Sequence, residues 1–400
     1  MVKHIKGIPS VKKAVYDLIA SRRDIAKADI MEHFRLTSSS LTRLLDEMTR
    51  EGWIMESGFG QSTGGRRPIL YQINAGARYI LGLDISRIYS VLGLYDMEMK
   101  PLELLRWNMD EQMTPQRLVE HVGRQTHELL LRHQLDREQV IGMGVGAVGP
   151  LSREQGRILN PLYFAAPGWN DVPLRSWLEE ATGLPVILEN GANTALIGEH
   201  WMVRSENIRH MLYVHIGTGL RSAMMSNGRI VHGAVDMEGS IGQMIIQTDG
   251  PRLHGSGNYG ALEAFASVQA VEQQVRARSK MSREQWTGGS LALKPEAINF
   301  TTIVQALDSG NEYVREIFAQ SAAYMGIGLA NLINVLHPEH IILGGVMISA
   351  NDLFYNTAIA VAEQNIYYSD SYQPEFSRGI LQETAVSTGA AVMVWNEMDI

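Results

Sequence analysis

The 400-residue chain contains no cysteine. Disulfide bonds, thiolate metal sites and cysteine nucleophiles are therefore excluded together. The sequence also lacks any apolar run near the roughly 18 to 20 residues that a membrane span requires, and its opening segment MVKHIKGIPSVKK has no hydrophobic signal core. We expect a cytoplasmic protein that does not span a membrane.

Acidic residues outnumber basic ones, which gives a net charge of −8, but the charge is unevenly distributed along the chain. Residues 1–78 hold 13 Lys/Arg and 8 Asp/Glu, a net charge of +5, whereas the remainder holds 22 and 35, a net charge of −13. A basic segment on an acidic body is expected when one domain meets a polyanion. A basic solvated face without a partner would give the same counts.

The first 50 residues show three segments with helical patterns. Apolar residues recur at helical spacing over 11–19 and 25–34. A third segment, LTSSSLTRLLDEMTREGW, places its leucines on one face and has Thr37 as an N-cap. This order predicts a helix-turn-helix whose last helix enters the major groove of DNA. The expected contacts from that helix are Ser38, Ser39, Thr42 and Arg43.

The next segment, WIMESGFGQSTGGRRPILYQIN, has two short β-like runs around a glycine-rich tip. This layout predicts a β wing. The tip carries Arg66 and Arg67, whose guanidinium groups suit phosphates or a narrow minor groove. A solvated turn would explain an isolated GRRP equally well, but its place directly after a helix-turn-helix favours contact with DNA.

From residue 79 the pattern changes to alternating strands and helices. Buried strand-like runs such as YILGLDIS, VIGMGVGA and LPVILEN are separated by helical segments, which predicts an α/β fold. The DIS of residues 84–86 and the GTG of residues 217–219 lie in similar strand-turn-strand contexts. A duplicated, two-lobed fold is consistent with this pattern.

The ordered set of motifs resembles the ROK family (repressors, open reading frames, kinases), specifically its helix-turn-helix regulators of the xylose- and N-acetylglucosamine-repressor type. The matching segments span most of the chain: GLDIS, GVGAVGP, LNPLYFAAPGWNDVPL, ENGANTA, HIGTGL, GSIGQM, GALE and NLINVLHPEHIILGG. The resemblance implies a winged helix-turn-helix in 1–78, followed by a two-lobed actin-like ATPase fold of the sugar-kinase type. Its first lobe would be 79–200, completed by a C-terminal helix in 383–400, and its second lobe 201–382.

Kinases of this family use the Asp of an ENDAN motif as the base that takes the proton from the sugar hydroxyl. Here the motif is ENGAN, with Gly191 at that position. The family's first phosphate loop, D-I-G-G-T, reads D-I-S-R-I over 84–88, although the second, Gly217-Thr218-Gly219, is retained. We therefore expect no catalytic residue and no kinase activity.

In the family, a glutamate and a histidine of a G-E-I-G-H motif bind sugar hydroxyls, but residues 239–243 read G-S-I-G-Q here. The resemblance leaves Asn190, Glu263 and the Gly149-Pro150 turn as sugar-binding candidates. Carboxylate and amide groups can hold a sugar through its hydroxyls. The alternative is that Glu263 only begins a helix, where its charge favours the helix dipole.

Family members with the motif C-x-C-G-x-x-G-C-L-E hold a structural zinc ion with three cysteines and the histidine of G-H. The corresponding positions here are His254, Ser256, Ala261 and Gln243. One plausible ligand does not hold Zn²⁺, so we expect no metal and no cofactor. Hydrogen bonds would order the metal-free loop, or the loop would order only on ligand binding; the sequence leaves both open.

These patterns predict a repressor that binds double-stranded operator DNA and responds to a sugar-type effector. A helix-turn-helix that reads a two-fold symmetric operator requires two copies, so we expect a homodimer or homotetramer. Two alternatives remain at this stage. One is an ATP-dependent sugar kinase with an added DNA-binding head, and the other is a ligand-independent repressor with a vestigial pocket.

Overall fold

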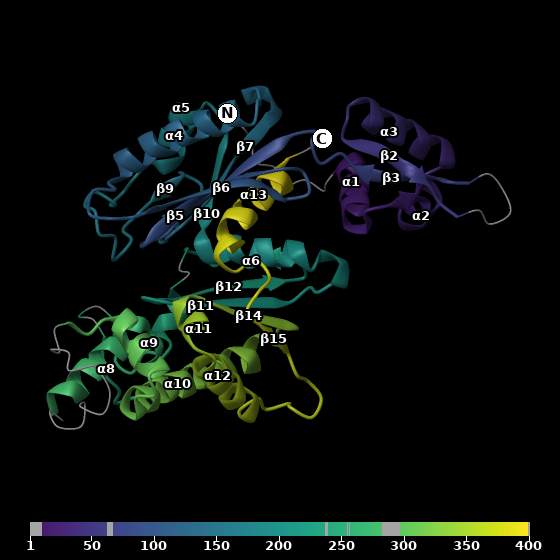
Figure 1. Cartoon of the computed structure of the whole chain (residues 1–400). Helices are drawn as coiled ribbons and strands as arrows, with labels where there is room; N and C mark the ends of the chain where they lie inside the picture. The colour runs from purple at the N-terminus through teal and green to yellow at the C-terminus, as the bar shows by residue number, and fades with distance from the viewer. Residues whose placement is uncertain are drawn as a thin grey trace. The chain divides into compact units, whose positions relative to one another are not determined.

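The computed structural model describes residues 10–61, 67–236, 239–253, 255, 257–281 and 297–398. The chain forms two compact units, and the chain ends both belong to the first. This first unit comprises Met1–Asn207 and Val386–Ile400, and the second comprises Ile208–Ala385. Each unit contains a five-stranded sheet with helices, which confirms the predicted α/β class (Figure 1).

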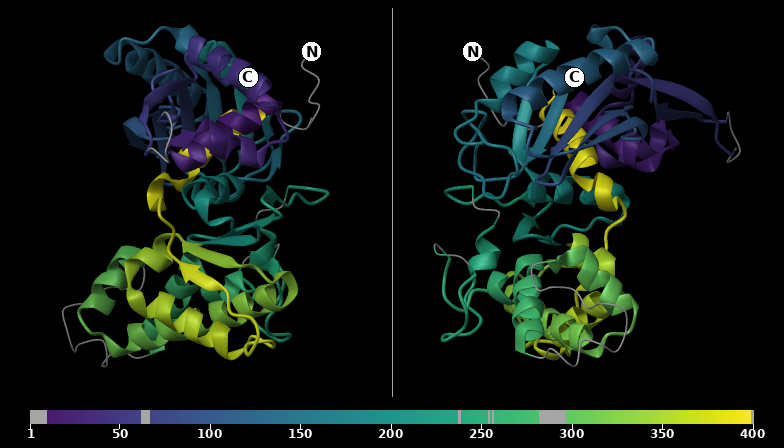
Figure 2. Two further views of the ribbon diagram at one scale, coloured as in Figure 1. Left: turned by 90° about the vertical axis from the view of Figure 1, so that its right-hand side faces the viewer. Right: turned by 60° about the vertical axis from the view of Figure 1, so that its left-hand side comes forward.

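The N-terminal part of the first unit is a winged helix-turn-helix. Its elements are α1 (Val11–Arg22), β1 (Ile25–Ala26), α2 (Lys27–His33), α3 (Ser38–Arg50), β2 (Ile54–Phe59) and β3 (Ile69–Ile73). The three strands form a small sheet in the order β1-β3-β2, and the β2–β3 hairpin extends away from the helices (Figure 2). As predicted, Thr37 caps α3, since its Oγ1 accepts a hydrogen bond from Ser40 N at 3.2 Å.

The predicted helical segment 25–34 is wrong at its start. Ile25 and Ala26 form the short strand β1, which pairs antiparallel with Tyr71 and Leu70 of β3. Pairing with a strand more than 40 residues away satisfies their backbone groups and buries both side chains, so it overrides the local helical spacing. The helix itself begins at Lys27.

The large sheet of the first unit has the strand order β10-β7-β4-β5-β6. Its strands are β4 (Tyr79–Ile85), β5 (Tyr89–Tyr95), β6 (Pro101–Asn108), β7 (Val140–Ala147) and β10 (Val186–Asn190), with a small hairpin of β8 (Leu151–Ser152) and β9 (Arg157–Ile158). Strands β4, β7 and β10 are parallel. Helices α4 (Pro115–Arg132) and α5 (Leu174–Thr182) cover one face, and α6 (Gly191–Met202) and α13 (Ala385–Glu397) cover the other.

The C-terminal helix α13 lies directly on this sheet. A Cβ atom at Gly82 of β4 would overlap the carbonyl oxygen of Ser387, and one at Gly144 of β7 would overlap that of Ala390. Only glycine allows the helix backbone to approach the strands this closely. The end of the chain is therefore part of the core of the first unit.

The sheet of the second unit has the order β13-β12-β11-β14-β15. Its strands are β11 (Met211–Ile216), β12 (Leu220–Ser226), β13 (Arg229–Ile230), β14 (His340–Gly344) and β15 (Glu375–Ser377). Its helices are α7 (Glu263–Ala266), α8 (Val268–Met281), α9 (Phe300–Asp308), α10 (Glu312–Leu336), α11 (Val346–Ala350) and α12 (Asp352–Gln364). Helices α8, α9, α10 and α12 pack together with the sheet around one hydrophobic core (Figures 1 and 2).

The two large sheets have the same topology. In each, an antiparallel three-stranded meander is extended by two further strands parallel to its first strand. Asp84 and Ile85 of the DIS motif end β4 and Ser86 follows it, while the GTG motif follows β11, so both motifs lie at the first turn of a meander. This agrees with the predicted duplication. None of the helices in the described part of the chain combines the length and apolar character needed to cross a membrane.

Candidate functional site

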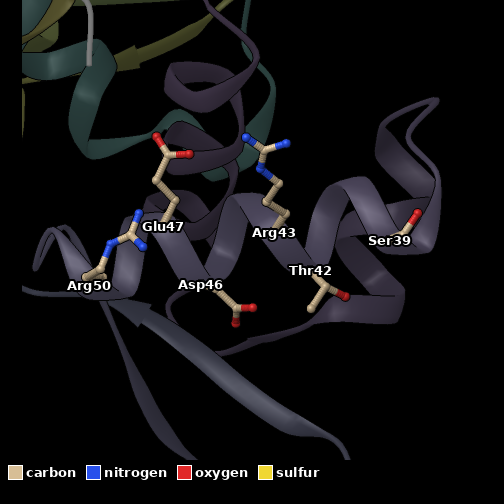
Figure 3. A pocket seen from close by; sticks show the side chains of 6 residues that line it. All are labelled: Ser39, Thr42, Arg43, Asp46, Glu47 and Arg50. Atoms are coloured by element: carbon tan, nitrogen blue, oxygen red, sulfur yellow. The ribbon is translucent and has the colours of Figure 1, made fainter.

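The outer face of α3 is polar and exposed. Leu41, Leu45 and Met48 lie on the opposite side of the helix and are buried in the core of the winged helix-turn-helix, which is called the head below. Six side chains surround a shallow hollow on its outer side, as Figure 3 shows: Ser39, Thr42, Arg43, Asp46, Glu47 and Arg50. Ser39 and Arg43 are exposed there, as a DNA-contacting role requires.

One edge of this face is held by a lysine that the sequence patterns did not identify. Lys27, the first residue of α2, donates from Nζ to Ser38 Oγ at 2.8 Å and to Thr42 Oγ1. Two of the predicted contact residues are therefore engaged within the protein. Lys27 adds a cation beside them and is itself a candidate phosphate contact. The sequence could have indicated this role only through the position of Lys27 near the start of the second helical segment.

The opposite edge is held by Lys12 of α1, whose Nζ lies 3.2 Å from Glu47 Oε1 and also pairs with Glu51. Burial acts to lower the pKa of Lys12, but hydrogen bonds to Glu51 and Glu47 outweigh it, so the pKa is raised. Lys12 thus stays charged and offsets both glutamates. On the wing, Arg67 is exposed, whereas Arg66 lies outside the described residues.

The first unit also gathers candidate ligand residues at one edge of its large sheet. Ala147 of β7 is in register with Ile85 of β4 and with Asn190 of β10. Because these strands are parallel, Asn190 at the end of β10 and Gly149 just after β7 lie at the same carboxyl edge. In open α/β sheets this edge is where ligands bind.

The contacts around Asn190 are largely internal. Asn190 is 2% exposed, and its Oδ1 caps α6 by accepting from Asn193 N at 2.8 Å. The preceding residue, Glu189, accepts at Oε1 from Asn190 N and Asn193 Nδ2, and its Oε2 lies 3.2 Å from Arg153 Nη1. The carboxylate that precedes Gly191 is therefore neutralised by an ion pair. Sequence patterns did not identify Glu189 or Arg153.

An arginine side chain extends from the first phosphate loop. Arg87 stands at the position of a family glycine and donates from Nε to the carbonyl oxygen of Leu162 at 2.8 Å. Its guanidinium carbon lies 5.6 Å from the centroid of the Tyr163 ring. The loop is thereby tied to segment 162–163, which gives it a side-chain contact that a glycine does not provide.

In the second unit, Glu263 is the first residue of α7, so it does begin a helix. Its carboxylate also reaches the GTG turn: Oε1 accepts from Leu220 N at 3.3 Å, and Oε2 accepts from Gln243 Nε2 at 3.2 Å. A Cβ atom at Gly219 would lie 2.5 Å from Glu263 Oε1. The last glycine of GTG therefore provides the space that this carboxylate occupies.

Gln243 connects Glu263 to the loop that aligns with the family's zinc motif, here called the glycine-rich loop, which contains Asn258. Its Oε1 accepts from Asn258 N at 2.8 Å, and Asn258 Nδ2 donates to the Gln243 carbonyl oxygen at 2.9 Å. Ala261 is buried and forms an isolated bridge with Ile245. These contacts favour the hydrogen-bonded alternative for this part of the loop. His254 and Ser256 lie outside the described residues.

The described residues include no group of three or more His, Asp or Glu side chains placed to hold a metal ion. The expectation that the protein binds no metal stays a prediction. What the site offers is hydrogen-bonding chemistry suited to hydroxyl groups, at Glu263 in the second unit and beside Gly149 and Asn190 in the first. The two sets belong to different units, and their binding of one sugar stays a prediction.

Comparisons with known proteins cover nearly the whole chain. Residues 80–397 match the ROK family. The chain is 27% identical over 406 residues to the xylose repressor of Caldicellulosiruptor bescii, with 100% of this chain and 97% of that protein covered. A solved ROK family transcriptional regulator, a homologue of the E. coli MLC protein, has a TM-score of 0.77 at 23% identity over 96% of both chains.

A solved ROK hexokinase from Thermus thermophilus has a TM-score of 0.66 at 25% identity, over 80% of this chain and 98% of that one. These likenesses confirm the predicted fold class, a winged helix-turn-helix followed by a two-lobed actin-like fold of the sugar-kinase type.

Proposed function

The chain belongs to the ROK family, and from this premise we propose that it is a DNA-binding transcriptional repressor that responds to a sugar or sugar derivative. The exposed polar face of α3, flanked by Lys27 and Lys12, carries this proposal. It has the shape and charge of a major-groove reading helix. Full-length likeness to a protein named a xylose repressor supports the same function.

We propose the following division of labour. Residues 1–78 bind DNA, and the lobes at 79–200 with 383–400 and at 201–382 sense the effector. Two sets of residues contact the operator: Ser38, Ser39, Thr42 and Arg43 in the major groove, and Arg66 and Arg67 on the wing. Because such operators are two-fold symmetric, the active form is a homodimer or homotetramer.

The proposed effector contacts are Asn190, Gly149 and Glu263. Glu263 accepts hydrogen bonds and Asn190 can both donate and accept, which suits the hydroxyl groups of a sugar. The Glu263 carboxylate is already aimed by Leu220 N and Gln243 Nε2. The effector is therefore proposed to be a sugar or a close derivative rather than an apolar molecule.

The protein is further proposed to lack kinase activity, although relatives with this fold include a hexokinase. Gly191 offers no carboxylate to act as base, and Glu189 is paired with Arg153. Arg87 places a side chain in the first phosphate loop. A coupled assay of ADP release with D-glucose, D-xylose and N-acetyl-D-glucosamine should give no signal, and sustained turnover with any of them would establish the kinase alternative.

The repressor function is tested in two steps with the full chain. Sequencing of DNA fragments selected by the protein should return a two-fold symmetric motif, whereas a selection without any motif would contradict the proposal. The same three sugars are then added to the complex with the selected DNA, and at least one should change its affinity. Specific DNA binding that no sugar alters would favour the ligand-independent repressor.

A further inference from the structure

The outward side of α3 carries an exposed carboxylate, Asp46, beside two arginines. With Leu41, Leu45 and Met48 marking the core side, a helical rotation of about 100° per residue places four residues within about 50° of the opposite direction. These residues are Ser39, Arg43, Asp46 and Arg50, all of them exposed. In Figure 3, Asp46 extends to the same side of the helix as Thr42. Asp46 therefore lies where a reading helix meets base edges.

Asp46 differs in its contacts from its acidic neighbour. Glu47 is held by Lys12 at 3.2 Å. Asp46 forms no hydrogen bond or ion pair within the described part of the chain, although Arg43 precedes it by three residues and Arg50 follows it by four. Its acceptor oxygens thus remain available to a partner outside the protein.

A carboxylate on a surface that meets phosphate groups costs binding energy unless it accepts hydrogen bonds in the complex. Among base edges in the major groove, the N4 amino group of cytosine is the donor that Asp and Glu characteristically accept from. Arg43, Arg50 and Lys27 keep the surrounding face positive, so the helix still approaches DNA despite this charge.

We propose that Asp46 is a specificity-determining residue that reads a cytosine in each operator half-site through the N4 amino group. This inference rests on the proposed DNA-binding function and adds the base class that the reading helix selects. Replacing the cytosine by guanine or thymine leaves Asp46 facing acceptor atoms or a methyl group, which weakens the complex. Adenine offers its N6 amino group only beside the N7 acceptor, which repels a carboxylate, so it is also a poorer partner than cytosine.

The test uses selection of bound DNA by the full chain and by the variants Asp46→Ala and Asp46→Asn. Wild-type protein should prefer cytosine at one position per half-site by roughly 5- to 150-fold, the range that one good base contact provides. Asp46→Ala should lose the preference at that position alone. Asp46→Asn should move it toward adenine, which an asparagine side chain pairs with.

Glu47→Gln is the matched control, because it removes an adjacent carboxylate of the same helix that Lys12 already holds; it should leave every base preference unchanged. Thermal unfolding of each variant verifies that the head is folded. If Asp46→Ala retains all base preferences and only binds more tightly, Asp46 merely repels phosphates and the inference is wrong. If Asp46→Ala instead loses a preference for guanine, Asp46 only positions an arginine that reads the guanine, and the inference is wrong. A wild-type selection without any motif would instead refute the proposed function itself.

Discussion

The side chain of Gln243 contacts both Asn258 and Glu263. Its side-chain oxygen accepts from Asn258 N, and its amide group donates to Glu263. One neutral side chain therefore joins the glycine-rich loop to the carboxylate proposed to contact the effector. Asn258 is exposed and Glu263 is half-buried, so the loss of Gln243 would affect Glu263 most.

Gln243→Leu tests this role. Removing the bridge takes one hydrogen bond from the exposed Asn258 N and one from the half-buried Glu263, and should lower the free energy of unfolding by about 0.5 to 1.5 kcal/mol. The measurement is urea unfolding, compared with Gln305→Leu, which changes an exposed glutamine of α9 and should stay within about 0.5 kcal/mol of wild type. Equal stabilities for the two variants would show that the bridge contributes nothing.

Metal removal gives a second prediction at this scale. Because an amide bridge occupies the position where zinc-bearing relatives have a histidine ligand, we expect no dependence on a bound ion. Incubation with an excess of EDTA, followed by dialysis, should leave both the melting temperature and DNA affinity unchanged. A fall in either that added Zn²⁺ reverses would contradict the expectation.

Residue roles were readable from the sequence where they depend on local spacing. Thr37 as a cap and the exposure of Ser39 and Arg43 follow from the helical pattern of α3. The contacts of Lys27 with Thr42 and of Arg153 with Glu189 were not readable, because each joins residues separated by many positions. Only the fold brings such pairs together.

At the scale of elements, α13 connects the body of the first unit to the DNA-binding head. Trp395 is fully buried, and its Nε1 donates to Asp17 Oδ1 at 3.0 Å. Lys13 Nζ lies 3.1 Å from the centroid of its ring, and the Tyr16 ring centroid lies 4.5 Å away. Helix α1 of the head is thus fixed to α13 by a hydrogen bond, a cation–π contact and aromatic packing.

Trp395→Ala should therefore destabilise the first unit by about 3 to 5 kcal/mol, the usual cost of truncating a buried aromatic side chain. Trp395→Phe keeps an aromatic face toward Lys13 but removes the hydrogen bond to Asp17, and we expect a smaller loss of about 1 kcal/mol beyond repacking. Urea unfolding provides the comparison, with Met202→Ala on exposed α6 surface as the control. A Trp395→Ala variant as stable as this control would contradict the role of α13.

Element prediction from the sequence succeeded for α3 and for the strand-turn-strand segments around DIS and GTG, where periodicity and turn residues agree. It failed at Ile25 and Ala26, whose strand exists only through pairing with β3. The sequence also did not predict which side of α13 packs against the rest of the protein. The sheet, through Gly82 and Gly144, and the head, through Trp395, together enclose this helix, so apolar residues occupy most of its circumference.

At the scale of the whole molecule, the net charge differs in sign between the part proposed to bind DNA and the part proposed to sense the effector. The net charge of +5 on residues 1–78 attracts DNA, whereas the net charge of −13 on the remainder repels it. This distribution favours approach to DNA by the head and discourages nonspecific wrapping of the body.

DNA affinity should accordingly fall as salt rises from about 50 to about 200 mM, with a linear dependence of log K on log salt. Arg67→Ala should reduce the magnitude of that slope by about 1 per head, since it removes one exposed wing cation. Fluorescence anisotropy with labelled operator DNA measures both slopes. The control is Arg132→Ala, which removes a cation of α4 that is paired with Glu103, and it should leave the slope unchanged. If Arg67→Ala also leaves the slope unchanged, the wing is not part of the proposed interface.

The position of α13 also has a consequence for biosynthesis. The first unit is interrupted by the whole of the second and is completed only by residues 386–400. At translation rates of about 5 to 20 residues per second, the intervening second unit delays completion by about 9 to 36 s. A nascent or prematurely terminated chain lacks Trp395 and the helix beneath β4 and β7. Helix α1 is thereby fixed to the body only after residues 386–400 have been synthesised.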